Sequence, residues 1–140
     1  MTAASNDLEV KILKHIFTNV STNGGAYTAP SSVFVSLHTG SPAEDNSGSN
    51  EISGSGYARQ SVTFGDVATD GSNNTSVSSN ATVQFPAASG NYSADVTFIG
   101  IYDAVSGGNL MFFGSLSTQK TVTTGDVFQI NSGSLTITLD

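Results

Sequence analysis

The sequence predicts a mainly β fold, an antiparallel β-sandwich or jelly roll with one short N-terminal α-helix. Short runs rich in β-branched and aromatic residues follow one another after Tyr27, and turn-forming residues separate them. Only residues 6–20 show the apolar spacing of an α-helix, so nothing indicates the alternating helices and strands of a parallel sheet. The length of 140 residues predicts one compact domain, with a helical segment at residues 1–25 and the sandwich at residues 26–140.

The helix is expected to begin at the capping box "NDLE", in which Asn6 is the N-cap and Glu9 reaches back to it. Apolar residues then recur at helical spacing and define one face, made of Leu8, Ile12, Leu13, Ile16, Phe17 and Val20. We expect this face to lie against the sheet or against a neighbouring subunit. The polar face of the helix carries too few cations for a helix that lies on a membrane surface.

The expected strands are residues 32–37, 59–65, 76–85, 95–103, 110–116, 120–130 and 132–140. The run 95–103 is apolar on both faces, which is typical of a central strand buried on both sides. The tract "DAVSGGN" that follows predicts a hairpin into the next strand. Residues 40–56 are too long and too polar for a tight turn, so we expect a loop that becomes ordered against a partner.

Charged residues form only 11% of the chain, against about 25% in ordinary soluble domains. The 11 acidic residues outnumber the 4 basic ones, which gives a net charge of −7 and leaves no basic patch for a phosphate backbone. We therefore expect no direct nucleic-acid partner. The lack of cysteine excludes disulfides and thiolate sites. Neither a secretory signal pattern nor an apolar run of about 18 residues occurs, so we expect no membrane partner.

No residue pattern predicts catalysis, a bound cofactor or a metal. His15 and His38 are both expected to be structural, because no G-x-S-x-G elbow accompanies them. Two loops carry oxygen ligands that calcium would accept, but neither has the EF-hand spacing. These ligands are Glu44, Asp45, Asn46 and Glu51 in the first loop, and Asp66, Asp70, Asn73 and Asn74 in the second.

The stretch "SGSGYARQSV" places Arg59, one of few cations, at the start of a strand. We expect Tyr57 to anchor the preceding loop by packing its ring. A guanidinium can hold a carboxylate through two parallel hydrogen bonds, so Arg59 is expected to form such a clamp. Asp95, Asp103 or an acidic residue of another subunit would serve as its partner, and the sequence favours neither the intramolecular nor the intersubunit pair.

Three stretches of the sequence form a distinctive combination. "VFVSLHTGSPAEDNSGSNEISGSGYARQSVTF" follows the pattern V-x-L-x-T-x-x-P…E-x-S-G-x-G-Y-A-R, and "FPAASGNYSADVTFIGIYDAVSGGNLMFFGSLSTQKTVTTGD" and the terminal "LTITLD" are the other two. Together they resemble a family of tailed-bacteriophage virion proteins. The likeness covers the chain from Val33 onward and the N-terminal helix. It implies a virion structural protein, not an enzyme. The signature positions are Tyr57, Arg59, Gly100, Asp103 and Gly107.

The first functional interpretation is a capsid decoration or cement protein that bridges capsomers on the outside of the head, with the major capsid protein as partner. The negative charge favours the outside, because packaged DNA is polyanionic. We expect a homo-oligomer, preferably a trimer, made in the host cytoplasm and assembled into the virion. The alternative is a tail component, a fibre-attachment, adaptor or baseplate module that binds a tail protein of the same virion.

Two further classes have less support. A host-glycan-binding module needs exposed aromatic platforms, whereas this chain has no tryptophan and its four tyrosines are scattered. A hydrolase has the least support. For a structural protein, the helix face and the 40–56 loop are the natural contact elements. The residues expected at an interface are Leu8, Ile12, Ile16, Glu44, Asp45, Glu51, Tyr57 and Arg59.

Overall fold

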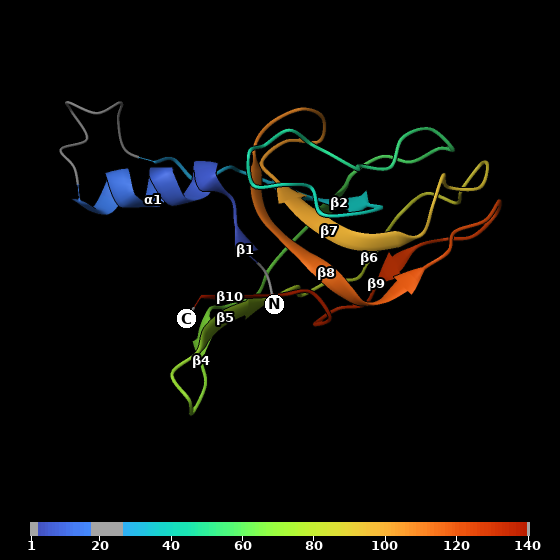
Figure 1. The fold of residues 1–140 in the computed structure, drawn as a ribbon. Coiled ribbons are helices and arrows are strands. Elements are labelled where there is room, and N and C mark those ends of the chain that lie inside the picture. The colour runs from blue at the N-terminus through green and yellow to red at the C-terminus, as the bar shows by residue number, and fades with distance from the viewer. Residues whose placement is uncertain (1–2, 18–26, 140) are drawn as a thin grey trace.

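The structure is a computed structural model that describes residues 3–17 and 27–139, and it consists of antiparallel strands with one N-terminal helix (Figure 1). In chain order the elements are β1 (Ala3–Ala4), α1 (Asn6–Phe17), β2 (Val33–His38), β3 (Gln60–Val62), β4 (Ala68–Thr69), β5 (Thr75–Ser78), β6 (Val83–Gln84), β7 (Val96–Tyr102), β8 (Leu110–Lys120), β9 (Gln129–Ile130) and β10 (Thr136–Leu139). The predicted fold class is therefore confirmed.

A five-stranded antiparallel sheet in the order β1-β8-β7-β2-β3 forms one layer of the fold. Its central strand, β7, is buried on both faces, since Ile101 on the core side and Tyr102 on the opposite side are both inaccessible, as is Val96. β7 and β8 form the predicted hairpin, with Ile99 opposite Gly114. Both predictions for this region are thus confirmed, although β8 continues to Lys120 instead of ending at residue 116.

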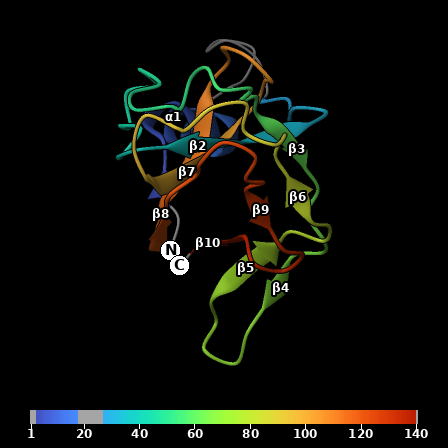
Figure 2. The same cartoon turned by 90° about the vertical axis from the view of Figure 1, so that its right-hand side faces the viewer.

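Two smaller sheets form the second layer, one in the order β10-β5-β4 and one that pairs β6 with β9. The β4–β5 hairpin extends away from the five-stranded sheet (Figure 2). The hydrophobic core lies between the layers and includes Val35, Leu37, Val62, Val83, Phe85, Ile99, Ile101, Phe128, Ile130 and Ile137. Within the described residues the strands do not close into a barrel.

Two predicted strands are interrupted, and local turn chemistry explains both corrections. The strand predicted at 76–85 splits into β5 and β6, because Asn80 between them donates from its backbone to Thr63 and from its side chain to the Phe64 carbonyl. The strand predicted at 120–130 is reduced to β9. There Asp126 caps a turn by accepting hydrogen bonds from the backbone and hydroxyl of Thr123, both at 2.8 Å.

The helix cap is Ser5, so the prediction of Asn6 as N-cap is wrong. Ser5 Oγ accepts a hydrogen bond from the backbone N–H of Leu8 at 3.3 Å, and its carbonyl accepts the N–H of Glu9 at 3.0 Å. The pairing of β1 with β8 places Ser5 there, because the Ser5 N–H donates to the Met111 carbonyl. Val20, the last residue of the predicted helix, lies outside the described residues.

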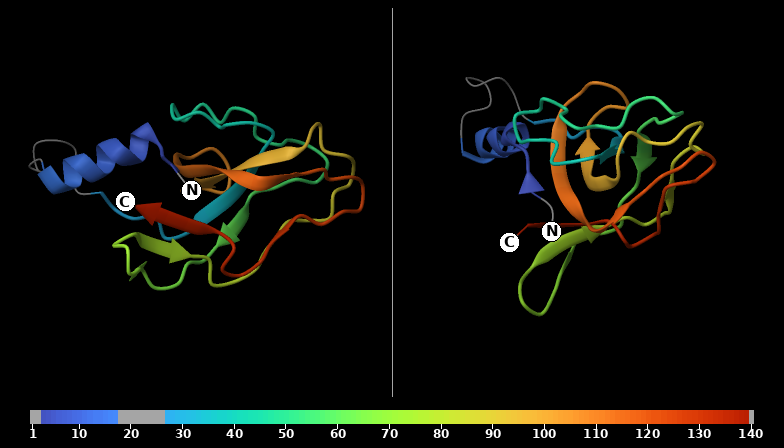
Figure 3. Two further views of the ribbon diagram at one scale, coloured as in Figure 1. Left: turned by 60° about the horizontal axis from the view of Figure 1, so that its bottom comes forward. Right: turned by 45° about the vertical axis from the view of Figure 1, so that its right-hand side comes forward.

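α1 projects from one end of the five-stranded sheet (Figures 1 and 3). Only Leu8 is buried, and Ile12 is half-buried. The other large apolar side chains of the helix are exposed, with fractions of 50% for Val10, 56% for Leu13, 61% for Ile16 and 76% for Phe17. Within residues 3–17 and 27–139, no helix is long and apolar enough to cross a bilayer. The sheet thus covers one side of α1 and leaves most of its apolar surface open.

The face of the five-stranded sheet that points away from the core is lined by Ser36 and His38 from β2 and by Tyr102 from β7, all of them buried. Gly100 makes room for them, because a Cβ at this position would lie 2.7 Å from Ser36 Oγ and 3.1 Å from a ring carbon of Tyr102. Such contacts are shorter than van der Waals packing allows. This face supports the cluster described below.

We predict that Gly100→Ala lowers the free energy of unfolding by about 1–3 kcal/mol, because the added methyl group overpacks this layer. Urea denaturation measures the change. Gly71→Ala is the matched control, since a Cβ there would meet nothing within 4 Å. Equal denaturation midpoints for the two variants would contradict the packing argument.

Candidate functional site

Arg59 is the centre of the most connected polar cluster among the described residues. It is only 8% exposed. Its Nε and Nη2 donate to the two carboxylate oxygens of Glu51, both at 2.7 Å, while Nη1 donates to the carbonyls of Ala104 at 3.1 Å and Gly107 at 2.7 Å. The predicted bidentate clamp is therefore present and intramolecular, and it joins the Glu51 loop to the β7–β8 turn.

The clamp partner is Glu51, so the prediction of Asp95 or Asp103 is wrong. Asp95 accepts hydrogen bonds from the side chains of Gln119 and Thr121. Asp103 accepts the backbone N–H and side-chain amide of Asn109 within the β7–β8 turn. Both carboxylates are therefore committed to local contacts.

The glycine-serine tract brings Glu51 to Arg59 by reversing the chain. Gly54, Ser55 and Gly56 have φ values of 72°, 50° and 77°, a left-handed run in which the two glycines, but not Ser55, are free of steric cost. The N–H of Tyr57 closes this turn on the carbonyl of Gly54 at 2.9 Å. The glycine-serine tract therefore forms a defined turn.

Tyr57 holds the carboxylate in place and anchors the loop, as predicted. Its hydroxyl donates to Glu51 Oε1 at 2.8 Å and accepts the N–H of Leu37 at 3.1 Å. Its ring stacks on Phe85 with centroids 6.0 Å apart, and meets Tyr92 edge-on. The side chain therefore connects the polar cluster to the hydrophobic core.

Tyr102 and His38 form the floor of the cluster. The guanidinium carbon of Arg59 lies 3.5 Å from the centre of the Tyr102 ring, a close cation–π contact, and the His38 ring is stacked on Tyr102 with centroids 6.3 Å apart. His38 Nδ1 donates to the Ser49 carbonyl at 2.9 Å, so the neutral ring accepts the Ser36 hydroxyl at Nε2. Burial lowers the pKa of His38 and keeps this ring neutral.

Sequence reasoning missed the roles of His38 and Tyr102 in this cluster. The signal was their alternation with core residues: Ser36 and His38 occupy the face of β2 opposite Val35 and Leu37. Buried polar groups on such a strand usually find partners inside the protein, as Ser36 and His38 do, whereas the buried Tyr102 hydroxyl has no hydrogen-bond partner among the described residues.

The charges of the cluster stabilise each other. Burial alone would raise the pKa of Glu51, but hydrogen bonds from Arg59 and Tyr57 outweigh it and hold this pKa below its ordinary value. Burial would likewise lower the pKa of Arg59, and the bonds to Glu51 raise it instead. Both groups are charged at neutral pH, and their hydrogen bonds occupy all three guanidinium nitrogens and both carboxylate oxygens. The arrangement is therefore a structural clamp and offers no activated base or nucleophile.

The other predicted contact residues of the loop, Glu44 and Asp45, do not join the clamp and are exposed. Asp45 caps a local turn by accepting the N–H of Ser47 at 3.0 Å. The loop is also held by its own chain, because the N–H of Ile52 donates to the Leu37 carbonyl and the N–H of Leu110 to Asn46 Oδ1. These bonds hold the loop within its own chain, and its ordering against a partner stays a prediction.

The second oxygen-rich loop is a capped turn as well. Asp70 Oδ1 accepts the backbone N–H groups of Ser72 at 2.8 Å and Asn74 at 3.0 Å. Across residues 3–17 and 27–139 no group of three or more His, Asp or Glu side chains is arranged to hold a metal ion. His15 lies exposed on α1, away from His38.

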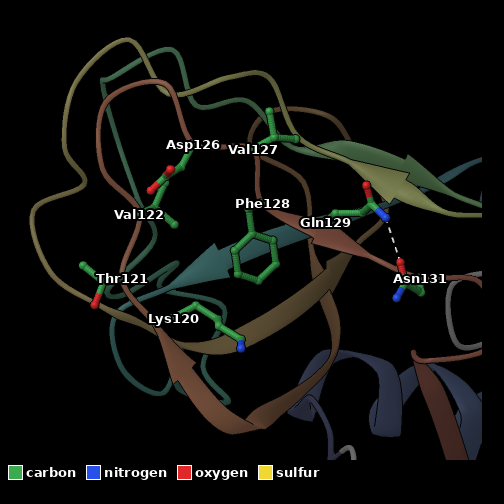
Figure 4. A pocket seen from close by; sticks show the side chains of 8 residues that line it. All are labelled: Lys120, Thr121, Val122, Asp126, Val127, Phe128, Gln129 and Asn131. Carbon is green, nitrogen blue, oxygen red and sulfur yellow. Dashed lines mark hydrogen bonds between the residues drawn. The ribbon is translucent and has the colours of Figure 1, made fainter.

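A pocket near the end of β8 carries no convergent set of free polar groups (Figure 4). Its lining residues are Lys120, Thr121, Val122, Asp126, Val127, Phe128, Gln129 and Asn131. Gln129 Nε2 donates to Asn131 Oδ1 at 2.7 Å, and Asp126 serves the turn with Thr123. The Phe128 ring is only 9% exposed, so it offers no stacking platform.

One comparison with known proteins identifies a family. Residues 3–138 match the family described as "Podophage GP4 fiber I protein gp80". The match runs from β1 through β10 and so includes α1, the clamp and both layers of strands. No curated protein matches the chain.

We predict that Glu51→Gln lowers the free energy of unfolding at pH 7 by about 3 kcal/mol, because it leaves the buried Arg59 without a counter-charge. The folded-state pKa of Glu51 lies below the ordinary 4.5, so its contribution is complete above that pH and is lost as the pH falls through the lower folded value. The difference between wild type and variant should therefore shrink below about pH 4.5.

Urea unfolding at pH 7 and at pH 3 measures this change. Glu44→Gln, an exposed change in the same loop, should have little effect at either pH. A constant difference between wild type and Glu51→Gln at the two pH values would show that the carboxylate charge does not stabilise the fold.

Proposed function

The chain belongs to the podophage GP4 fiber I protein gp80 family, a family of phage tail fibre proteins, and from this premise we propose that it is an assembly module of the tail fibre. It is a structural component of the virion, and the family is not known as enzymatic. In this role the β body serves as a rigid unit, and α1 provides the contact with another protein of the tail.

The family supports the second functional interpretation of the sequence, a tail component, better than the first, a capsid decoration protein. A fibre protein implies partners in the virion tail. The acidic charge, which favours the outside of the head over its interior, is equally compatible with a fibre, since both surfaces lie away from packaged DNA.

The distribution of exposed apolar side chains carries the proposal. Val10, Leu13, Ile16 and Phe17 all lie on α1, whereas the other large exposed apolar residues, Val67, Val105 and Val127, lie on separate parts of the β body. Isolated apolar residues are normal on a surface, but a concentrated group marks a contact site. A projecting helix with such a group is suited to assembly.

Tyr57, Tyr92 and Tyr102 do not give the glycan-binding alternative an exposed aromatic platform. Tyr92 and Tyr102 are 8% and 2% exposed, and Tyr57 is stacked on Phe85 beneath the loop. Sugar recognition by stacking needs an aromatic face open to solvent. These rings instead support the core and the clamp.

We predict that antibodies against this chain label the tail of intact particles and not the head surface, as seen by immunogold electron microscopy. Particles made without the gene for this chain should lose fibre density in a cryo-electron map while their heads remain unchanged. Those particles are also the control for antibody specificity. Label spread over the head, or a normal set of fibres without the chain, would refute the proposed function.

A further inference from the structure

We propose that α1 packs in parallel against α1 of a second copy of this chain, through a stripe made of Val10, Leu13 and Phe17. The inference rests on the assembly role proposed above and names the partner.

The stripe lies on the side of α1 that faces away from the sheet. Leu8 is buried and Ile12 half-buried on the sheet side, where α1 contacts β8. With 3.6 residues per turn, Val10, Leu13 and Phe17 fall on the opposite side. Their exposed fractions are 50%, 56% and 76%. The helix therefore has an inner apolar face that its own sheet covers and an outer one that the described residues leave open.

The spacing of the stripe is that of a helix–helix seam. Steps of three and then four residues correspond to successive a, d and a positions of a heptad, which interlock with the same positions of a neighbouring helix. A helix that packs only on its own sheet needs no second apolar side. This pattern indicates another helix as the occupant of the outer face.

The charges beside the stripe indicate an identical helix in parallel orientation. Glu9 precedes Val10 and flanks the stripe at a g position, and Lys14 follows Leu13 and flanks its other side at an e position. In a parallel pair a g residue faces the e residue five positions further along the other chain. Glu9 of each copy then faces Lys14 of the partner subunit, whereas an antiparallel pair would bring like charges together.

The neighbouring charges and the helix anchor are compatible with this arrangement. Asp7 and Lys11 pair with each other within the helix at 2.8 Å, so they do not compete for the pairing across the seam. Ser5 fixes the start of α1 on β8, and α1 projects beyond the sheet (Figure 3). Copies related by a rotation axis parallel to their helices would place these seams side by side.

The absence of cysteine from the sequence allows a direct test by single-cysteine cross-linking of the full chain. We expect Leu13→Cys and Val10→Cys each to form disulfide-linked dimers under mild oxidation, because identical positions meet in a parallel seam. His15→Cys, exposed on the same helix but outside the stripe, is the matched control and should remain monomeric. Dimers from Leu13→Cys without dimers from Val10→Cys would indicate an antiparallel pair and overturn the proposal.

Charge reversal tests the pairing independently by sedimentation equilibrium. Glu9→Lys or Lys14→Glu alone should weaken self-association about three- to tenfold, and the double variant should restore it. Phe17→Glu should abolish association without changing the thermal unfolding midpoint, because this side chain is exposed. Val67→Glu, at an exposed apolar residue of the β body, should leave association unchanged.

A chain that stays monomeric at all concentrations and forms no cross-links at positions 10 and 13 would overturn the inference. That result is distinguishable from failure of the proposed function. Tail labelling combined with a monomeric purified chain would retain the fibre role and assign the outer face of α1 to a different tail protein. Head labelling would refute the fibre role itself, whatever the oligomeric state.

Discussion

Burial of the Arg59 guanidinium is the constraint on which the outer face of the five-stranded sheet depends. A charge that is almost inaccessible to water must be neutralised and hydrogen-bonded where it lies. Glu51 supplies the charge, two carbonyls of the β7–β8 turn accept the remaining bonds, and Tyr102 supports the flat guanidinium. The loops on both sides of Arg59 therefore have one favourable arrangement. The tight glycine-serine turn brings Glu51 into this arrangement, and Gly100 leaves the room that Tyr102 occupies beneath it.

The sequence predicted those parts of the fold that a periodic pattern specifies. The central strand β7, its hairpin with β8 and the helix were readable because each repeats an apolar spacing over several residues. The helix cap at Ser5 could not be predicted, because the two-residue strand that pairs with β8 and positions Ser5 has no sequence pattern of its own. The Glu51 partner was missed because proximity across a left-handed turn depends on backbone conformation. Strand breaks near Asn80 and Asp126 follow from side-chain hydrogen bonds that compete with strand pairing.

The molecule combines a self-sufficient β body with a helix that is incompletely covered. Polar groups of the clamp find their partners within the chain, so the body keeps its shape without a ligand. The few charges of the surface reduce repulsion between neighbouring copies, which suits a component packed at high local concentration. α1 departs from this pattern with its outer apolar side. The same chain therefore provides a stable unit and a means of joining units, as a fibre requires.

The short anchor of α1 determines how the protein carries mechanical load. A pull on the helix reaches the sheet through β1, whose two residues pair with Phe112 and Phe113, and through the contacts of Ser5 with Leu110 and Met111. These bonds join the longest strand of the sheet, so force spreads along β8 into its neighbours. Because few hydrogen bonds join α1 to the sheet there, we expect this junction to yield to force before the sheet does.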